Sequence, residues 1–241
     1  MIANQGEASM TDLAQGIGAS GSAVHRILTA LKKKGLVEQT TENGPYSLSW
    51  SILALAQRLM ADADVRTIAL PYMNALRDRV GETVTLNVRS GFTRVCIDQV
   101  VGPHEVSWRK GVGQVAPLGV GATGKAFLAY LTAPELEAFW DETTLEKLTP
   151  HTTVDKQDLV RELAAVRERG LAFGIQDRLL GVAGISAPIF DGPGSVAAAL
   201  TIAGPTERCT TEQLEEWVEP LTSATREISK ILTSATNASA G

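Results

Sequence analysis

The sequence has no uninterrupted apolar run of eighteen residues, which excludes a membrane-spanning helix of ordinary length. Its N-terminus also lacks the basic segment, apolar core and small-residue cleavage site of a secretory leader. The 241 residues are 44% hydrophobic and 20% charged, which fits a soluble protein with one small and one larger domain. We therefore expect a cytoplasmic protein with no membrane partner.

Cysteine and histidine are scarce and scattered. Cys96 and Cys209 have no CxxC spacing, which argues against a disulfide staple or a thiolate metal site. His25, His104 and His151 have no carboxylate or cysteine neighbour at ligand spacing. The sequence thus predicts two structural thiols, no metal site and no cofactor.

The chain also lacks an excess of positive charge. Its net charge of −5 gives no support to a general nucleic-acid coat. Residues 1–50 carry four basic and four acidic side chains, so this segment is neutral overall. Any contact with DNA phosphates must therefore be local, and the affinity would depend on dimerisation.

Residues 9–48 have the pattern of a winged helix-turn-helix. Apolar residues of the second helix recur at i, i+3, i+4 and i+7, and polar residues fall on the opposite face. The predicted inward residues are Val24, Ile27, Leu28 and Leu31, and the outward ones are Ser22, His25, Arg26, Thr29 and Lys33. An outward face that is short, polar and basic suits a helix that enters the major groove.

Local signals delimit the two helices. Ser9 and Ser20 are candidate N-caps, and Gly16–Ala19 supplies the turn between the helices. Three lysines fill the last turn of the second helix, and Gly35 allows a left-handed exit. The segments 36–40 and 46–48 then flank Asn43-Gly44, a strong hairpin signal, which predicts the wing. Helix-turn-helix geometry also occurs as plain packing, and the wing with the basic helix end favours DNA binding.

The remainder predicts a linker helix and an α+β domain. Residues 50–65 read as one amphipathic helix, followed by a helix over 68–80. The predicted strands cover 84–89, 93–100, 105–110, 172–176, 184–190 and 195–203, with helices from about 124–131, 155–169 and 211–232. We expect Gly170 to end the second of these helices and Pro220 to bend the third. Hairpins flanked by helices are typical of small-molecule sensor domains.

No catalytic constellation stands out. Residues 119–125 match the glycine and lysine spacing of a phosphate-binding loop, but Ala126 replaces the hydroxyl residue that would hold magnesium. Small residues at such a turn can let backbone N–H groups approach an anionic ligand, or can simply make a tight turn. Ser107, Ser186, His104 and Asp98 could be assembled into a triad, but no serine lies in a nucleophile elbow. We expect no enzymatic activity.

The chain resembles the isocitrate lyase regulator (IclR) family of bacterial transcription factors over residues 1–232. The matching motifs are Ser22-Ala23-Val24-His25-Arg26-Ile27-Leu28, Gly44-Pro45-Tyr46-Ser47-Leu48, Pro117-Leu118, Gly124-Lys125-Ala126, Arg167-Glu168-Arg169-Gly170, Ala187-Pro188-Ile189 and Gly204-Pro205. The resemblance implies a DNA-binding winged helix, a linker helix and a GAF-like effector domain with an antiparallel sheet. It also implies a dimer or a dimer of dimers.

The resemblance places operator contacts on the second helix and the wing. We assign them to Ser20, Gly21, Ser22, Ala23, His25, Arg26, Lys33 and Tyr46. Gly21 and Ala23 stand where family members often have a basic residue and a threonine, so some phosphate or base contacts are missing. This fits the neutral charge of the segment.

The resemblance also places an effector site in the second domain. We assign it to Trp108, Arg109, Ala122, Thr123, Gly174, Gly184, Thr201 and Ala203. Two glycines and an alanine stand where polar side chains are common, and Gly119 replaces a common histidine. These changes predict a roomier, less polar pocket for a ligand larger than a two- or three-carbon acid. Arg109 is a candidate anion partner, and Trp108 is either a pocket wall or a packed residue.

Family members place a long apolar helix before the segment that matches Ser9–Gln15, and only residues 1–4 match its end. Either the start codon lies upstream, or the protein senses a ligand and holds DNA weakly. We expect a partly truncated winged helix over 1–49, a linker helix over 50–66, an effector domain over 67–236 and a disordered tail over 237–241. The predicted function is a ligand-responsive repressor of a catabolic or secondary-metabolism operon, and the alternative is a sensor or corepressor without DNA binding.

Overall fold

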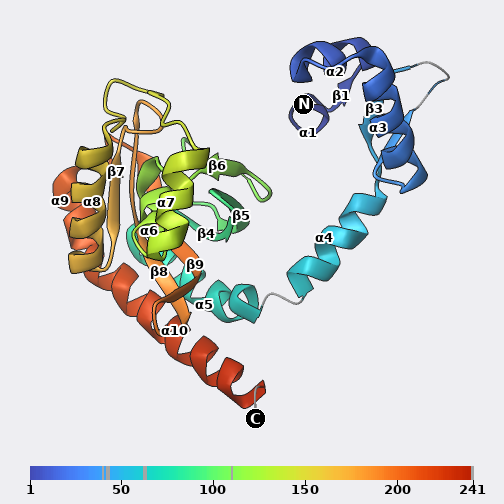
Figure 1. Cartoon of the computed structure of the whole chain (residues 1–241). Helices are drawn as coiled ribbons and strands as arrows, with labels where there is room; N and C mark the ends of the chain where they lie inside the picture. Colours follow the sequence, from blue (N-terminus) through green and yellow to red (C-terminus); the bar gives the residue numbers. More distant parts are fainter. Residues whose placement is uncertain (40, 42–43, 62–63, 110, 240–241) are drawn as a thin grey trace. The chain divides into compact units, whose positions relative to one another are not determined.

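The computed structural model describes residues 1–39, 41, 44–61, 64–109 and 111–239. The chain divides into two compact units (Figure 1). The first unit is Met1–Ala63 and the second is Asp64–Gly241. Each unit has its own hydrophobic core.

The first unit is a small helical layer on a three-stranded sheet. Its helices are α1 (Ile2–Gln5), α2 (Met10–Ile17), α3 (Gly21–Lys33) and α4 (Ser51–Ala61). Its strands are β1 (Glu7–Ala8), β2 (Val37–Gln39) and β3 (Tyr46–Leu48), in the order β1-β3-β2 with antiparallel pairing. The predicted winged helix-turn-helix is confirmed.

Local hydrogen bonds fix the helix ends, as the sequence predicts. The Ser9 hydroxyl accepts a hydrogen bond from the Asp12 N–H at 3.1 Å, and Asp12 accepts one from the Ser9 N–H at 3.3 Å. The Ser20 hydroxyl accepts one from the Ala23 N–H at 3.3 Å. The turn is shorter than predicted because α2 continues through Ile17, and Gly18 makes the left-handed step at φ 63°.

The core of the first unit explains one wrong prediction. Val24 and Leu28 are buried against Ala8, Leu13, Val37 and Tyr46. Ile27, which we predicted to face inward, is 50% exposed and does not belong to this core. The described elements cover only the side of α3 that carries Val24 and Leu28, and Ile27 lies beside that stripe. The wing strands form as predicted, whereas residues 40 and 42–43 of the turn lie outside the described residues.

The boundary between the linker and the second unit differs from the expected one. Helix α4 ends at Ala61, and the next helix, α5 (Asp64–Val80), already includes Val65. Val65 is 7% exposed and belongs to the core of the second unit, four and eight residues before the fully buried Ala69 and Met73. This helical spacing makes Val65 part of the buried face of α5 rather than part of a linker.

The second unit is a six-stranded antiparallel sheet with helices on both faces (Figure 1). Its strands, in the order β6-β5-β4-β9-β8-β7, are β4 (Thr83–Ser90), β5 (Thr93–Val100), β6 (Val115–Pro117), β7 (Ala172–Ile175), β8 (Val182–Gly192) and β9 (Ser195–Pro205). Its helices after α5 are α6 (Gly121–Leu128), α7 (Ala133–Glu142), α8 (Lys156–Arg169), α9 (Thr211–Glu216) and α10 (Val218–Ser239). The predicted α+β class is confirmed.

The two faces of the sheet differ in chemistry. Helices α5 and α10 pack on a face of large apolar side chains, which include Val84 and Leu86 of β4. Because successive strand residues point to opposite faces, Thr85 and Asn87 of the same strand face the side of α6. Polar side chains therefore line the layer between the sheet and α6, where a cavity lies.

Several predicted elements are corrected. Residues 105–109 form no strand, and the edge strand beside β5 is β6, which pairs through Val115 with Val95. Helix α7 was missed, although Thr132 and Glu135 form its capping box. The last helix is interrupted at Trp217 rather than bent at Pro220, which sits in the first turn of α10. Helix α10 continues to Ser239, inside the predicted disordered tail.

Candidate DNA-reading helix and ligand cavity

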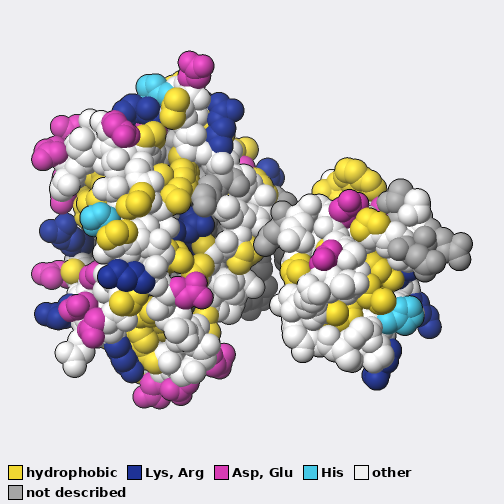
Figure 2. Space-filling view, turned by 90° about the horizontal axis from the view of Figure 1, so that it is seen from above, with side chains coloured by type: hydrophobic (Ala, Val, Ile, Leu, Met, Phe, Trp, Pro, Cys, Tyr) yellow, Lys and Arg dark blue, Asp and Glu magenta, His cyan; other side chains and the backbone are white. Residues whose placement is uncertain are grey.

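Helix α3 exposes a polar, basic face. Ser22, His25 and Arg26 are exposed, as are Thr29 and Lys33 further along the helix. Figure 2 shows the basic and histidine side chains of the smaller body gathered along one side in that view. The Ser20 cap fixes the start of α3, so the first two turns hold these side chains in a defined direction. A helix with such a face can lie in a major groove.

The eight residues assigned to operator contacts do not all reach the surface. Six are exposed, namely Ser20, Gly21, Ser22, His25, Arg26 and Lys33, and Ala23 is half-buried. Tyr46 is only 7% exposed and packs in the core of the first unit, so its assignment is corrected. Tyr46 pairs with Ala8 and Gln39 in the centre of the small sheet, and this register turns its ring inward.

A cavity lies between the sheet of the second unit and the start of α6. It is lined by Thr85, Asn87, Arg94, Cys96, Trp108, Gln114, Gly121, Ala122, Thr123, Gly174, Asp177, Arg178, Leu179, Val182, Ala183, Gly184, Thr201 and Ala203. Seven of the eight residues assigned to the effector site are among them. The exception is Arg109, which is exposed and donates a hydrogen bond from Nε to the Ser107 hydroxyl at 3.2 Å.

A chain of hydroxyl groups closes one wall of the cavity. Ser186 donates to the Leu200 carbonyl at 3.1 Å, and its oxygen lies 2.8 Å from the Thr201 hydroxyl. Thr201 in turn lies 2.8 Å from the Thr123 hydroxyl of α6. If Ser186 donates to Leu200, each following hydroxyl donates along the chain, so Thr123 and Thr201 can only accept hydrogen bonds from a ligand.

The glycines of the cavity lie directly against backbone atoms of neighbouring elements. A Cβ at Gly174 would lie 2.4 Å from the Ala122 backbone nitrogen, and one at Gly184 would lie 2.4 Å from the Ile202 carbonyl oxygen. Backbone atoms therefore fill the room that side chains would take, and the glycines allow α6 and neighbouring strands to approach closely. The lining combines Arg94, Asn87 and several threonines with apolar side chains, and the roomier, less polar pocket stays a prediction.

The most unusual group in the cavity is Arg94 of β5, which sequence reasoning missed. The residue is 8% exposed, and its Nη1 donates to the Asn87 Oδ1 at 2.7 Å. Burial, and then the nearby charge of Arg178, lowers the pKa of the Arg94 guanidinium to about 10. Burial raises the pKa of the neighbouring Cys96 thiol. Arginine alternating with cysteine in a predicted strand was the only signal, and it did not reveal burial.

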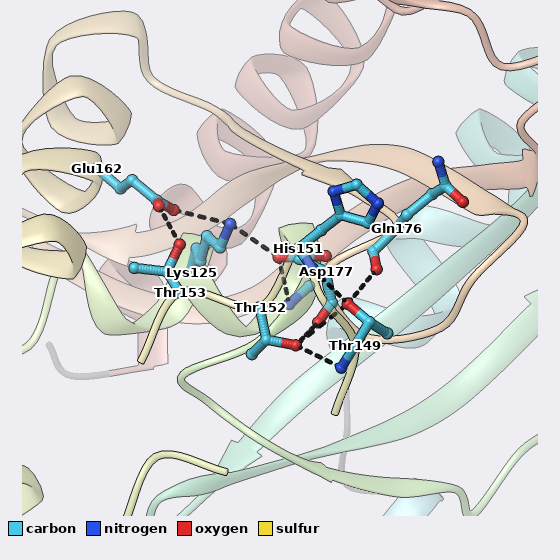
Figure 3. Close-up of polar contacts among 9 residues, drawn as sticks. Lys125, Thr149, His151, Thr152, Thr153, Glu162, Gln176 and Asp177 are labelled. Atoms are coloured by element: carbon cyan, nitrogen blue, oxygen red, sulfur yellow. Dashed lines mark hydrogen bonds and ion pairs between the residues drawn. The ribbon is translucent and has the colours of Figure 1, made fainter. Parts of the chain in front are cut away.

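A buried lysine ties the cavity wall to α8 (Figure 3). The Lys125 Nζ lies 2.8 Å from the Asp177 Oδ2 and 2.8 Å from the Glu162 Oε2. Asp177 also accepts a hydrogen bond from the Gly121 N–H at 3.1 Å. Burial alone would lower the pKa of Lys125, but the two carboxylates outweigh it and raise that pKa. Thr152 donates to the Asp177 carbonyl at 2.6 Å, which holds the turn in place.

The segment that resembles a phosphate-binding loop is a tight structural turn. A Cβ at Gly124 would lie 2.2 Å from the Leu118 carbonyl oxygen, so this glycine is needed for close packing. Lys125, which follows this glycine, pairs with two carboxylates and is therefore not available to bind an anionic ligand.

Both Cys96 and Cys209 are buried free thiols, as the sequence predicts.

No described helix is long and apolar enough to cross a membrane. Within the described ranges, no cluster of three or more His, Cys, Asp or Glu side chains could hold a metal ion.

Comparisons with known proteins agree with this architecture. The family model "IclR helix-turn-helix domain" matches residues 1–41, and "Bacterial transcriptional regulator IclR C-terminal" matches residues 57–230. The repressor AllR of Escherichia coli K12 is 30% identical over 227 residues, which cover 94% of this chain and 84% of AllR. The repressor IclR of the same organism is 29% identical over 93% of this chain and 83% of its own length. The crystal structure of the Thermotoga maritima IclR has a TM-score of 0.72 and 28% identity, covering 96% of this chain and 94% of that one.

A winged helix with an exposed polar reading face, followed by an α+β unit with a cavity, defines a helix-turn-helix regulator of transcription. The family matches together span most of the chain. The chain belongs to the IclR family of bacterial transcriptional regulators. The two Escherichia coli relatives, AllR and IclR, are transcriptional repressors.

Proposed function

We propose that this protein is a cytoplasmic, ligand-responsive repressor that binds operator DNA through α3 and a small-molecule effector in the cavity beside α6. The observation that carries the proposal is the exposed trio Ser22, His25 and Arg26 on a capped helix, in one chain with a polar internal cavity. AllR and IclR are named as repressors, which supports repression rather than activation by this protein. A catabolic or secondary-metabolism operon is the proposed target.

The exposed face of α3 offers few contacts with DNA per monomer. Arg26 and Lys33 supply the charge on the exposed face of α3, and His25 can donate or accept at a base edge. Because so few phosphates can be neutralised, affinity should depend on two copies bound to adjacent half-sites. Trp50, Leu53 and Leu55 of the linker region are 83%, 52% and 62% exposed, and such an apolar surface supports self-association.

The position of α6 supports the proposed response to an effector. Its first residues contact β7 closely and share a hydroxyl chain with β9, so a ligand in the cavity touches both the sheet and the helix. Asp177 and Lys125 continue this contact to α8. A ligand that favours one arrangement of these elements by about 1–3 kcal/mol would change operator occupancy several-fold or more.

The experiment measures binding of the full chain to duplex DNA from the region upstream of its own gene, by fluorescence anisotropy at several salt concentrations. We expect specific binding that weakens with salt, and a loss of tenfold or more in the double variant His25→Ala/Arg26→Ala. The matched control is Arg79→Ala, which removes an exposed arginine of α5 and should leave binding unchanged. If the wild-type chain binds no promoter duplex better than unrelated DNA, the alternative of a sensor without DNA binding replaces this proposal.

A further inference from the structure

A second cavity lies between the turn that precedes α6 and the segment that follows α7. Its volume is about 310 Å³, and it shares no lining residue with the cavity beside α6. Val120 of the turn is 4% exposed and Phe139 of α7 is 1% exposed, so these two side chains form its buried end. Leu148 is 45% exposed and lies at its opening. The volume falls within the range of small-molecule sites, which is about 300–1,000 Å³.

The walls of this cavity are apolar and aromatic. The Phe92 and Phe139 rings meet edge to face, with their centroids 5.6 Å apart, and Leu145 lines the cavity with them. A Cβ at Gly119 would lie 2.6 Å from the Leu145 Cδ2, so the glycine lets the Leu145 side chain lie against the turn. Water makes few hydrogen bonds against such walls, and its displacement by an apolar group is favourable. The cavity therefore suits an apolar ligand, and its phenyl rings can pack edge to face against a ligand ring.

The few polar groups of the lining disfavour an anionic ligand. Among the described residues that line the cavity, the one charged side chain is Glu146, which is exposed. The Thr93 hydroxyl donates to the Ser90 carbonyl at 2.8 Å, and the Thr143 hydroxyl donates to the Phe139 carbonyl. These two hydroxyl groups can therefore only accept a hydrogen bond from a ligand. A carboxylate would meet a like charge and further acceptors, whereas an uncharged ligand with a hydroxyl group can donate to them.

We infer that this cavity is a second ligand site, which takes an uncharged aromatic compound of one or two rings. A dry apolar cavity of about 150 Å³ takes one benzene ring, so the volume here is sufficient for two fused rings. A phenolic hydroxyl group would match the accepting oxygens of Thr93 and Thr143. The inference goes beyond the proposed function, because it concerns a different cavity from the one proposed for the effector. A ligand in it would contact Gly119 and Val120, the two residues directly before α6.

The experiment measures binding of 2-naphthol to the full chain by calorimetry at pH 7, where phenols are neutral. We expect the wild type to bind one 2-naphthol per chain. The charged competitor is 2-naphthoate, which has the same two rings. It should compete with 2-naphthol at least about tenfold more weakly than 2-naphthol itself binds, because its carboxylate has no cationic partner in the lining.

Three leucine-to-tryptophan variants locate the bound probe. Leu145→Trp fills the second cavity and should weaken 2-naphthol binding by about tenfold or more. Leu179→Trp places the same bulk at the lining of the cavity beside α6, and Leu180→Trp places it outside both linings. Leu179 and Leu180 are 45% and 57% exposed, so both of these control variants should fold and bind 2-naphthol as the wild type does.

Circular dichroism establishes whether Leu145→Trp folds. If it does not fold, Leu148→Trp, at the opening of the same cavity, takes its place with the same expected loss. The inference is overturned if the wild type does not bind 2-naphthol, if 2-naphthoate competes equally well, or if the folded cavity variant retains wild-type affinity. An equal or larger loss in Leu179→Trp would place the probe in the cavity beside α6 and would also overturn it. If 2-naphthol does not bind and the cavity variant has a lower oligomeric state in sedimentation, a second copy of the chain covers the cavity and the inference is wrong.

Discussion

Replacing Lys125 by methionine tests the buried ion pairs that support the cavity. The Lys125 side chain is 9% exposed and that of Asp177 is 8% exposed, so the substitution leaves a carboxylate buried without its cation. Glu162 is 36% exposed and can turn to water, so its share of the loss is small. Breaking a buried pair by removing one partner costs about 3–5 kcal/mol. For a unit of this size, each 1 kcal/mol shifts the melting temperature by about 2–4 °C, which predicts a fall of about 6–20 °C.

The pH dependence of stability adds a second signature. Because the pKa of Lys125 is raised in the folded chain, its contribution is complete below its ordinary value of 10.5 and is lost as the pH rises through the folded value. Burial would raise the pKa of Glu162, but hydrogen bonds from Lys125 and Thr153 lower it below 4.5. Its contribution is therefore complete above pH 4.5 and is lost as the pH falls further. Lys125→Met should lack the alkaline loss and show a weaker acid loss.

The assay is chemical and thermal unfolding of the full chain, followed by circular dichroism between pH 3 and 11. The control is Lys147→Met, an exposed lysine whose removal should change the unfolding free energy by less than about 0.5 kcal/mol. The double variant Lys125→Met/Asp177→Asn removes both buried charges and should recover part of the loss. If Lys125→Met unfolds within about 1 kcal/mol of the wild type, the claim that these pairs hold the cavity wall is refuted.

Two further predictions concern packing. In Gly174→Ala the new Cβ would lie 2.4 Å from the Ala122 nitrogen, so we expect a loss of about 1–3 kcal/mol in urea unfolding. Gly192→Ala, which meets nothing within 4 Å, should be neutral, and equal values for the two variants would contradict the close approach of α6. Leu28→Ala should destabilise the first unit by about 2–5 kcal/mol because Leu28 is 3% exposed. Ile27→Ala, at a position 50% exposed, should cost less than about 1 kcal/mol, and a larger cost would show that Ile27 is covered.

Helix and turn signals that act over a few residues were predictable. Ser9 and Ser20 cap the helices they were predicted to cap, and Gly170 ends α8 in the left-handed conformation at φ 73°. These features depend on a hydroxyl and a backbone N–H two or three residues apart, or on a glycine that tolerates positive φ, so the sequence contains the whole interaction. The capping box of α7 is equally local, and attention to Thr132 and Glu135 would have found that helix.

Burial at single positions was less predictable. Tyr46 was expected at the surface and is buried, whereas Ile27 was expected in the core and is exposed. The elements that cover Tyr46 and leave Ile27 uncovered are distant from these residues in the sequence. The two glycines of the cavity suggested empty space, whereas backbone atoms of α6 and β9 occupy it. A residue type reports what a position tolerates, but only the packed neighbours decide whether the space is filled.

The sequence by itself determined the winged helix and most of the helices and strands of the second unit, because caps, turns and hydrophobic periods are properties of short segments. Its motifs also indicated the IclR family. The tertiary structure alone decided which charges lie together. Arg94 reaches the cavity through the pairing of β4 with β5, and Lys125 meets Asp177 and Glu162 only when α6, α8 and the turn after β7 are assembled. The strength of an interaction between two charges depends on the distance between them and on the exclusion of water, and the order of residues in the sequence specifies neither directly.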